Sequence, residues 1–307
     1  MKLVVVGSSN MDLVISLPRI PAVGETVLGG RSSMVFGGKG ANQAVASIRS
    51  GGDVAFISKV GNDLFGENIR THFKKEGFPP NLILTDTDEP TGIAQIFVSE
   101  KGENSIAVAP GANMKLMPQD IEPFTDLIKN SEVVLVQLEI PLETVEHIAL
   151  CADQNNTKLI LNPAPAQKLG ETLLKKVWLI TPNETEASLL TGIEVKDMAS
   201  AEKAAKSLLK MGVKNVIVTL GENGCLFCNG NDTKYFRAYK TMAVDTTAAG
   251  DVFNGTLAVA MTSGKSFLEA IDFAAAAAAI SVTREGAQPS IPTLLEIKKF
   301  LDEAKNQ

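Results

Sequence analysis

The chain has 307 residues, of which 45% are hydrophobic and 21% charged, so it can bury a full core as one large domain or two modest ones. This composition excludes an intrinsically disordered chain, a collagen and a small disulfide scaffold. The 29 basic and 35 acidic residues give a net charge of −6, which argues against a nucleic-acid coat and against a basic membrane-surface protein.

The sequence contains no candidate membrane span, because about 20 apolar residues are needed and the alanine-rich run from Phe273 to Ile280 is much shorter. The apolar run at the start of the chain ends at Gly7, too early for a signal peptide, so we interpret it as a first β-strand. Cys225 and Cys228 form a single C-x-x-C pair, which we interpret as two ordinary cysteines in a strand of a cytoplasmic protein.

Strand and helix patterns alternate along most of the chain. The first strand is predicted at 3–6, and a glycine-rich turn leads into a helix over 41–50. The elements that follow are strand 54–57, helix 64–76, helix 121–129, strand 133–136, helix 142–153, strand 159–161, strand 179–180, helix 184–190, helix 201–211 and strand 216–219. This alternation predicts an α/β fold with a parallel central sheet and helices on both of its faces.

Two segments interrupt the alternation. The apolar runs 93–98 and 105–109 flank Glu100-Lys101-Gly102-Glu103-Asn104, which is typical of a hairpin. The segment 14–36 has short apolar runs, two prolines and several glycines, without a helical period. We interpret both as antiparallel strands that leave the main sheet and form one small β-subdomain. The last third of the chain is predicted to be helical, over 249–262, 267–283 and 294–304.

The strongest chemical signal is the run Asp245-Thr246-Thr247-Ala248-Ala249-Gly250-Asp251 at the start of the predicted helix 249–262. Small residues at a helix start leave backbone N–H groups free to bind an anion, and the helix dipole favours negative charge there. Asp251 is either a capping charge in the first turn or a general base that takes a proton from an attacking hydroxyl. The residues alone leave both alternatives open.

A second signal is the stretch Phe36-Gly37-Gly38-Lys39-Gly40-Ala41-Asn42-Gln43. Its spacing matches neither a Walker loop nor the G-x-G-x-x-G fingerprint. Glycine allows the backbone to approach a ligand closely, and Lys39 and Asn42 offer hydrogen-bond donors. The alternative is a helix start that needs glycine for a positive φ.

Other polar residues follow predicted strands, where ligands bind in open α/β sheets. Asn10 and Asp12 end the first strand, and Glu139 follows the strand that begins at 133, but turn caps and solvated loop charges would look the same. The run Asn183-Glu184-Thr185-Glu186 is also typical of a helix cap. Thr219-Leu220-Gly221-Glu222-Asn223-Gly224 is also typical of an ordinary glycine-rich turn.

Together these stretches resemble the ribokinase branch of the PfkB carbohydrate kinase family, over nearly the whole chain. The residues that carry the resemblance are Gly-Gly-Lys-Gly-Ala-Asn-Gln at 37–43, Asn-Pro-Ala-Pro-Ala at 162–166, Asn-Glu-Thr-Glu at 183–186, Asp-Thr-Thr-Ala-Ala-Gly-Asp at 245–251 and Gly-Ala-Gln-Pro-Ser at 286–290. The resemblance implies a single ribokinase-like α/β domain over 1–307, a three-layer sandwich with a small β-sheet lid formed by insertions at about 14–36 and 91–110.

The resemblance also implies transfer of the ATP γ-phosphoryl group to the 5-hydroxyl of D-ribose, giving D-ribose 5-phosphate. Asp251 would be the general base, and the N–H groups of Ala248, Ala249 and Gly250 would form an anion hole. The residues expected to bind the sugar are Asn10, Asp12, Gly38, Lys39, Asn42, Glu139 and Asp251. Those expected to bind ATP are Asn183, Thr219, Leu220, Gly221, Glu222, Asn223, Gly224, Gly250 and Asp251.

Two metal ions and a partner subunit are implied as well. Mg²⁺ accompanies ATP and is placed by Glu186 through water. A monovalent activator, K⁺, is expected near the anion hole, several of its ligands being carbonyl oxygens, at Asp245, Thr247, Ser281, Arg284, Gly286 and Ser290. In this family the lid also forms a homodimer interface. The resemblance implies a cytoplasmic enzyme without a nucleic-acid or membrane partner.

Ala275 stands where some relatives place a polar side chain near the adenine, so contacts with the base are expected there to be apolar or through the backbone. One alternative is a kinase for another sugar, such as deoxyribose, or for a nucleoside, because a single hydroxyl cannot be deduced from sequence. The other is a sugar-binding regulator that kept the fold and lost catalysis, although the intact Asp251 and its small-residue run count against it.

Overall fold

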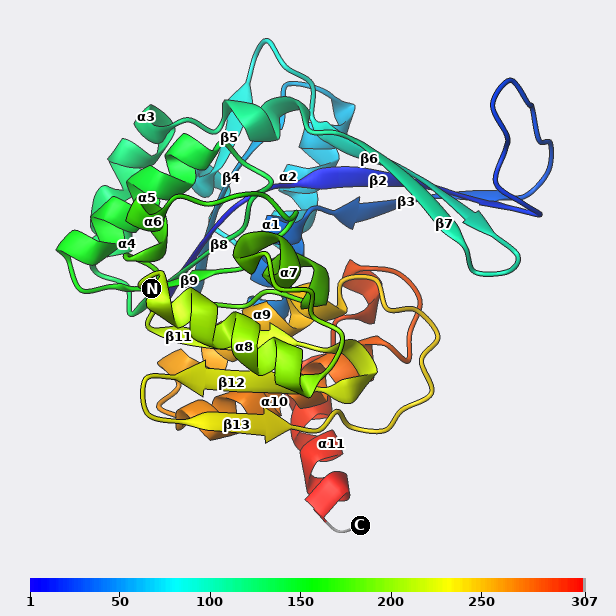
Figure 1. Ribbon diagram of the computed structural model, residues 1–307. Helices are drawn as coiled ribbons and strands as arrows, with labels where there is room; N and C mark the ends of the chain where they lie inside the picture. The colour runs from blue at the N-terminus through cyan, green and yellow to red at the C-terminus, as the bar shows by residue number, and fades with distance from the viewer. Residues whose placement is uncertain (306–307) are drawn as a thin grey trace.

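The computed structural model describes residues 1–305, and its strands form two sheets of unequal size. The larger sheet has nine strands in the order β13-β12-β11-β10-β9-β8-β1-β4-β5, and the smaller has four in the order β3-β2-β6-β7 (Figure 1). Helices lie on both faces of the larger sheet. The predicted α/β fold, with a mostly parallel central sheet and a small second sheet, is therefore confirmed.

The central strands of the large sheet are short and apolar, as expected for strands that are covered on both faces. The bounds are β1 Leu3–Val6, β4 Val54–Gly61, β5 Ile83–Asp86, β8 Val133–Val136, β9 Lys158–Leu161, β10 Leu179–Ile180, β11 Asn215–Thr219, β12 Cys225–Asn229 and β13 Thr233–Phe236. The strands from β11 to β5 are parallel to one another, whereas β12 and β13 pair antiparallel at one edge.

Each face of the large sheet has its own hydrophobic core. The helices on one face are α1 Lys39–Arg49, α2 Leu64–Glu76, α9 Ala249–Thr262, α10 Phe267–Ser281 and α11 Leu294–Lys305. The helices on the other are α3 Pro118–Ile121, α4 Thr125–Lys129, α5 Leu142–Gln154, α6 Glu171–Leu174, α7 Glu184–Thr191 and α8 Met198–Lys210. Within residues 1–305, no helix is long and apolar enough to cross a bilayer.

The observed elements differ from the predicted ones at several places of the body, one of them the short helix α6, which was not expected. The single helix expected over 121–129 is instead divided among α3, a 3₁₀ turn Glu122–Phe124 and α4. Pro123 explains the break, because it has no backbone N–H to donate within a helix. The strands β5 and β13 were not expected; both lie at edges of the sheet, where partial exposure weakens the apolar pattern.

The small sheet projects from the body next to α1 and α2 (Figure 1). Its strands are β2 Asn10–Leu17 and β3 Arg31–Gly37 from the first interruption, and β6 Gly92–Ser99 and β7 Asn104–Ala109 from the second. The expectation of purely antiparallel strands is wrong for the central pair, because β2 and β6 run parallel. Both follow parallel strands of the body, β1 and β5, and so leave it in the same direction.

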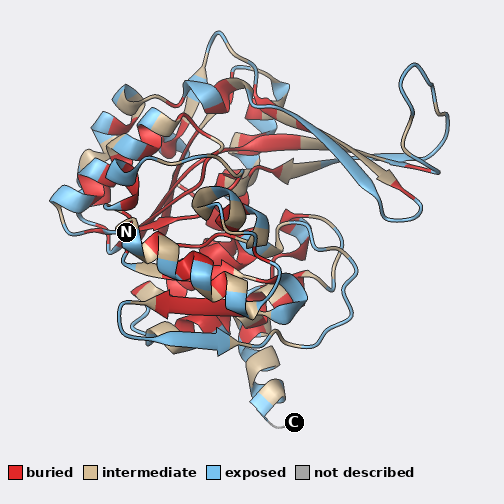
Figure 2. Ribbon diagram, in the orientation of Figure 1, coloured by how far each residue is buried: buried red, intermediate tan, exposed pale blue. Residues whose placement is uncertain are grey.

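The small sheet is exposed or half-buried over most of its length, whereas the central strands of the large sheet and the inner faces of the helices are buried (Figure 2). All six residues of β7 are exposed, and two of them, Ile106 and Val108, are large and apolar. Cross-strand pairing places these two side chains on the same face as Val14, Ile96 and Asp12. That face therefore carries an apolar stripe that runs outward from Asp12.

Candidate active site

The predicted site residues gather where the small sheet joins the body. This is the edge of the large sheet at which β1, β8, β10 and β11 end, and ligands bind at such an edge in open α/β sheets. Asn10 and Asp12 do not end the first strand, as the sequence suggested, since β1 stops at Val6. They lie instead at the start of β2, with Ser8 and Ser9 in the connection.

Asp251 lies in the first turn of α9 and is only 7% exposed. Two amides of α1 donate to its carboxylate: Nδ2 of Asn42 to Oδ2 at 3.0 Å, and Nε2 of Gln43 to Oδ1 at 2.9 Å. Burial raises the pKa of Asp251, while the charge of Lys39 and the two amide donors act against that rise. A buried carboxylate with a raised pKa is suited to accept a proton.

The backbone at the start of α9 offers free N–H groups beside this carboxylate. Ala248 has a φ of 61°, in the left-handed region that non-glycine residues adopt at a cost of about 1 kcal/mol or more. The N–H of Ala249 donates to the carbonyl of Thr246 at 3.2 Å. The N–H groups of Ala248 and Gly250 have no hydrogen-bond partner in the part of the chain that the structure describes. Two of the three expected anion-hole donors are therefore available.

The Asp12 carboxyl group lies close to two other carboxylates. Burial, with the charges of Glu139 and Asp251, raises its pKa to about 7. Its Oδ1 is buried and has no hydrogen-bond partner among residues 1–305. A side chain at Gly37 would collide with this carboxylate, so only glycine leaves room for it. The unpaired oxygen is therefore free to accept a hydrogen bond from a ligand.

The side chain of Asn10 is held by Asn113, a residue that the sequence did not single out. Nδ2 of Asn113 donates to Oδ1 of Asn10 at 2.7 Å, and Oδ1 of Asn113 accepts from the backbone N–H of Ser9 at 2.8 Å. These bonds fix the Asn10 amide, so that its nitrogen is its free donor. Asn113 stands alone in a 3₁₀ turn far along the chain, where no sequence pattern marks it.

The Glu139 side chain links the segment after β1 to the start of α1 through two hydrogen bonds. Its Oε2 accepts from the Ser8 hydroxyl at 2.5 Å and from the backbone N–H of Lys39 at 2.9 Å. The Lys39 ammonium group faces several carboxylates. Burial acts to lower the Lys39 pKa, but the charges of Asp251, Glu139 and Glu186 raise it. Lys39 is therefore protonated and offsets part of the repulsion among these acids.

Asn183 caps α7 in the way that the sequence allowed. Its Oδ1 accepts from the N–H of Glu186 at 2.8 Å, and its own N–H donates to Oε2 of Glu186 at 2.9 Å. Burial raises the pKa of Glu186, against the bond from Asn183 and the charge of Lys39. Asn183 also pairs with Thr219 in a single parallel bridge, so these two polar positions lie side by side.

The turn after β11 carries the remaining expected nucleotide ligands. The N–H of Leu220 donates to the carbonyl of Gly224 at 2.8 Å, and its side chain is buried in the core, so Leu220 can offer a ligand only its backbone. Gly221 and Gly224 have φ of 52° and 91°. A side chain at Gly224 would collide with the carbonyl oxygen of Phe236, so the fold itself requires glycine at this position. Glu222 and Asn223 between them are exposed.

Asp245 draws two segments of the expected cation site together. Its Oδ1 accepts from the N–H and the hydroxyl of Thr247 at 2.8 and 2.6 Å, and its Oδ2 accepts from the N–H of Gly286 at 2.8 Å. Ser281 and Ser290 donate their hydroxyls to carbonyls of their own turns. The Arg284 side chain is paired with Glu296 of α11 at 2.6 Å.

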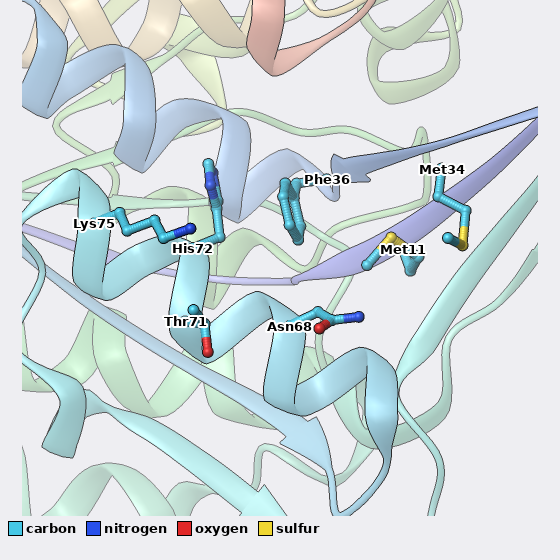
Figure 3. Close-up of a pocket in the computed structure, with 7 residues that line it drawn as sticks. All are labelled: Met11, Met34, Phe36, Asn68, Thr71, His72 and Lys75. Atoms are coloured by element: carbon cyan, nitrogen blue, oxygen red, sulfur yellow. The ribbon is translucent and has the colours of Figure 1, made fainter.

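A separate cavity of about 260 Å³ lies on the other face of the small sheet (Figure 3). It is lined by Met11, Met34, Phe36, Asn68, Thr71, His72 and Lys75. Phe36 of β3 stacks on His72 of α2, with ring centroids 4.0 Å apart. Successive strand residues point to opposite faces, so Met11 faces this cavity and Asp12 faces the site. None of the predicted site residues lines the cavity.

Comparison with known proteins matches residues 1–294 to the pfkB family carbohydrate kinases. A ribokinase of Haemophilus influenzae is 47% identical over 302 residues, covering 98% of this chain and 99% of that protein. A deoxyribokinase of Salmonella typhi is 35% identical over 302 residues, with 98% and 99% covered.

The solved structure of an Arabidopsis thaliana ribokinase complexed with ribose and ATP is similar as well. It superposes with a TM-score of 0.91 at 34% identity, covering 98% of each chain. The ribokinase-like fold that the motifs implied is thus confirmed. A buried acid at a helix start, a glycine-rich turn beside it and these matches along nearly the whole sequence lead to one conclusion: the chain belongs to the pfkB family of carbohydrate kinases.

Proposed function

We propose that the protein transfers the γ-phosphoryl group of ATP to the 5-hydroxyl of D-ribose, giving D-ribose 5-phosphate. The observation that carries this proposal is the buried Asp251 carboxylate, fixed by two amides at the start of a helix with free N–H groups. The relatives named ribokinase, one of them in a structure with ribose and ATP, support this pair of substrates.

In this mechanism Asp251 accepts the proton of the sugar hydroxyl as that oxygen attacks the γ-phosphorus. Phosphoryl transfer depends mainly on positioning and on stabilising the charge of the transferred group. The N–H groups of Ala248 and Gly250, with the positive end of the α9 dipole, would stabilise that charge. The third expected donor, Ala249, would first have to give up its bond to Thr246.

We assign the sugar to the acceptors and donors around Asp251. Oδ1 of Asp12 and Oδ1 of Asn42 are buried without partners among the described residues, and each would accept from a sugar hydroxyl. Asn10, Lys39 and Glu139 would complete the ring of contacts. Gly38, with a φ of 90°, packs against the backbone of Ser8 and Asn10 and allows the chain to approach the sugar closely.

We assign ATP to Asn183, Thr219 and the turn that follows, up to Gly224, together with Gly250 and Asp251. One oxygen of Glu186 caps α7, which leaves Oε1 to accept from a water molecule of hydrated Mg²⁺. This fits the ion, because Mg²⁺ keeps several of its waters and needs few carboxylates. When bound, Mg²⁺ neutralises charge on the β- and γ-phosphates.

We place K⁺ in the loop pair that Asp245 joins. Its proposed surroundings are oxygen-rich, from carboxylate, hydroxyl and carbonyl groups at Asp245, Thr247, Ser281, Arg284, Gly286 and Ser290, the last three acting through the backbone or a hydroxyl. Oxygen ligands suit a hard cation. Its positive charge would lie close to the anion-binding start of α9.

We further propose that the small sheet is a lid over the sugar and that two lids form a homodimer. The stripe on the face of Asp12 includes Ile106, which is 55% exposed, and Val108, which is 52% exposed. Contiguous exposed apolar surface of this kind marks an interface. A covered site would also exclude water, which competes with the sugar for the phosphoryl group.

The substrate is tested with an ATP-coupled assay over pentoses, hexoses and nucleosides, with and without K⁺. We expect D-ribose to give the highest kcat/KM, and K⁺ to raise the rate. A higher kcat/KM for deoxyribose or for a nucleoside would favour the alternative kinases. A rate that does not respond to K⁺ would contradict the proposed cation site.

The role of Asp251 is tested with Asp251→Asn, which keeps the shape and removes the base. We expect sugar binding, measured by calorimetry, to persist while turnover falls at least ~100-fold. Turnover close to that of the unmodified protein would contradict the proposed role. Loss of both binding and turnover would instead point to a sugar-binding carboxylate.

A further inference from the structure

Gln43 is fully buried, and its amide makes three hydrogen bonds to other side chains. Its Nε2 donates to Oδ1 of Asp251 at 2.9 Å and to Oδ1 of Asn162 at 3.0 Å, while its Oε1 accepts from Nε2 of Gln137 at 2.6 Å. Because it is 0% exposed, Gln43 cannot touch a substrate. Whatever it contributes to the reaction, it contributes through Asp251.

The partners of Gln43 come from a row of buried polar residues beneath the site. Gln137, Asn162 and Thr181 directly follow β8, β9 and β10, which are neighbours in the large sheet. Parallel neighbouring strands end at the same edge, so these side chains lie in one layer. Three polar residues in succession at the ends of buried strands are costly unless each is hydrogen-bonded.

This row fixes which way the Gln43 amide faces. Nδ2 of Asn162 donates to the backbone carbonyl of Thr181 at 3.3 Å, so Oδ1 of Asn162 is left to accept from Gln43. A flipped Gln43 amide would place its oxygen against two acceptors and its nitrogen against the donor of Gln137. The orientation of the Gln43 amide is thus fixed, through Asn162, by the backbone carbonyl of Thr181, which cannot turn over as a side-chain amide can.

The same network returns to the helix of Asp251. The hydroxyl of Thr181 donates to Oδ1 of Asn254 at 2.6 Å, and Nδ2 of Asn254 donates to the carbonyl of Gly250 at 2.8 Å. The carboxylate and the first turn of α9 are therefore held from both sides by one network of buried polar side chains, those of Gln43, Asn162, Thr181 and Asn254. Each member is fully or almost fully buried.

The charged groups that face Asp251 come from four other elements. Lys39 at the start of α1 favours its ionised form, and Glu139, after β8, disfavours it. Asp12 on β2 and Glu186 on α7 lie close enough for their charges to interact with that of Asp251. Within this mainly acidic surrounding, the donors on the carboxylate itself are Asn42 and Gln43. Removing one donor weakens the support for negative charge.

We propose that Gln43 is a positioning residue, which holds the Asp251 carboxylate by Oδ1, keeps it ionised and leaves Oδ2 toward the sugar. The proposal rests on the proposed role of Asp251 as the base. Asn42, which bonds Oδ2, belongs to the sugar-binding side, whereas Gln43 and the row beneath it belong wholly to the protein interior. A purely structural role for Gln43 would leave the proton affinity of Asp251 unchanged.

The test compares Gln43→Met, which keeps the volume and removes the donors, with the unmodified full-length protein. We expect kcat to fall about 10-fold or more while KM for the sugar changes less than about threefold. The acid limb of the kcat–pH profile is expected to move to higher pH by about one unit, because a carboxylate with fewer donors binds its proton more tightly. Ser50→Ala, at the end of α1, is the matched control: its buried hydroxyl donates to the carbonyl of Ser47 at 3.0 Å and not to Gln43 or Asp251, so the limb is expected to stay in place.

An acid limb that stays in place in Gln43→Met overturns the proposal, even if kcat falls. Should Gln43→Met fail to fold, Gln137→Met decides, because it keeps the donor but frees the Gln43 amide to turn. A smaller shift in the same direction then supports the proposal, and no shift overturns it. Asp251→Asn is measured alongside as a separate test of the base. Retained turnover in that variant would refute the proposed role of Asp251 as the base, rather than its positioning by Gln43.

Discussion

At the residue scale, Asp12 is a carboxylate that the folded protein holds at a cost in stability. Burial and repulsion from Glu139 and Asp251 raise its pKa from 3.8 to about 7. The unfolded chain loses this proton first, so the stability associated with the neutral group is complete below pH 3.8 and is lost as the pH rises toward 7. A sugar hydroxyl on the unpaired oxygen would offset part of that cost.

We therefore expect Asp12→Asn to be more stable than the unmodified protein, and increasingly so at higher pH. The gain should be of the order of 2 kcal/mol larger at pH 8 than at pH 5.5, because the ionised carboxylate is then absent. Sugar affinity should fall at least ~10-fold through loss of an acceptor. Thermal unfolding at the two pH values and calorimetry with D-ribose measure both effects. Equal gains at both pH values would contradict repulsion as the cause.

Sequence alone could single out Asp251, Lys39 and Asn42, because they stand in runs of glycine and alanine that are unusual in ordinary helices. Gln137 and Asn113 could not be found in this way. Each is one polar residue in an unremarkable stretch, and each joins the site only because the fold brings a strand end or a turn to it. Their part in the site depends on hydrogen-bond geometry, which no spacing encodes.

At the element scale, the position of Asp251 depends on how closely α9 crosses α1. A side chain at Gly255 would collide with the backbone carbonyl of Gln43 and press on Ala46. The Ser47 hydroxyl bridges the same crossing by donating to the Gly255 carbonyl at 3.0 Å. Only glycine allows the two backbones to approach far enough for α1 amides to reach the carboxylate.

Gly255→Ala is expected to lower the free energy of unfolding by about 2 kcal/mol through overpacking. The direction of this change is informative, because replacing glycine by alanine within a helix otherwise raises the free energy of unfolding by up to about 1 kcal/mol. Turnover should fall too, since α9 carries Asp251 away from its donors. Gly230→Ala, in an exposed turn with open space around it, is the control and should change neither stability nor turnover. Denaturant unfolding and the kinase assay are applied to both variants. A Gly255→Ala protein as stable as the Gly230→Ala control would refute the close crossing of α1 and α9.

Elements with local boundary signals were predicted well. Helix α2 begins after Asp63, whose carboxylate accepts from the N–H of Gly66 at 2.8 Å, and ends at Gly77 with a φ of 98°. The parallel pairing of β2 with β6 had no such signal. It follows from the directions of β1 and β5 in the large sheet, which is a property of the assembled fold rather than of either segment.

At the scale of the whole molecule, the exposed apolar stripe on the small sheet predicts the oligomeric state. The unmodified protein should sediment at twice the 32.6 kDa of one chain. Ile106→Glu combined with Val108→Glu places charges on the apolar face and should give a monomer. Ser105→Glu adds a charge to the same strand on its other face and serves as the control. Sedimentation equilibrium measures all three proteins. A double variant that remains a dimer would show that the interface lies elsewhere.

The net charge of −6 could indicate the class of protein but not how it would hold an anionic nucleotide. The proposed nucleotide site answers this locally, since free N–H groups at the start of α9 and the protonated Lys39 lie among the acids. The sequence placed these residues on separate stretches, and only folding brings them to one sheet edge. The global charge therefore describes the surface and says little about the site.

The distance along the chain between α1 and α9 has a consequence during synthesis. A ribosome that adds about 5–20 residues per second delivers α9 roughly 10–40 s after α1. Through that interval the face of α1 that α9 will cover, including Ala46 and Ser47, lacks the helix that packs against it in the folded protein. The nascent chain is expected to be most prone to aggregate in that interval, and the cluster of side chains around Asp251 cannot form until nearly all of the chain has emerged.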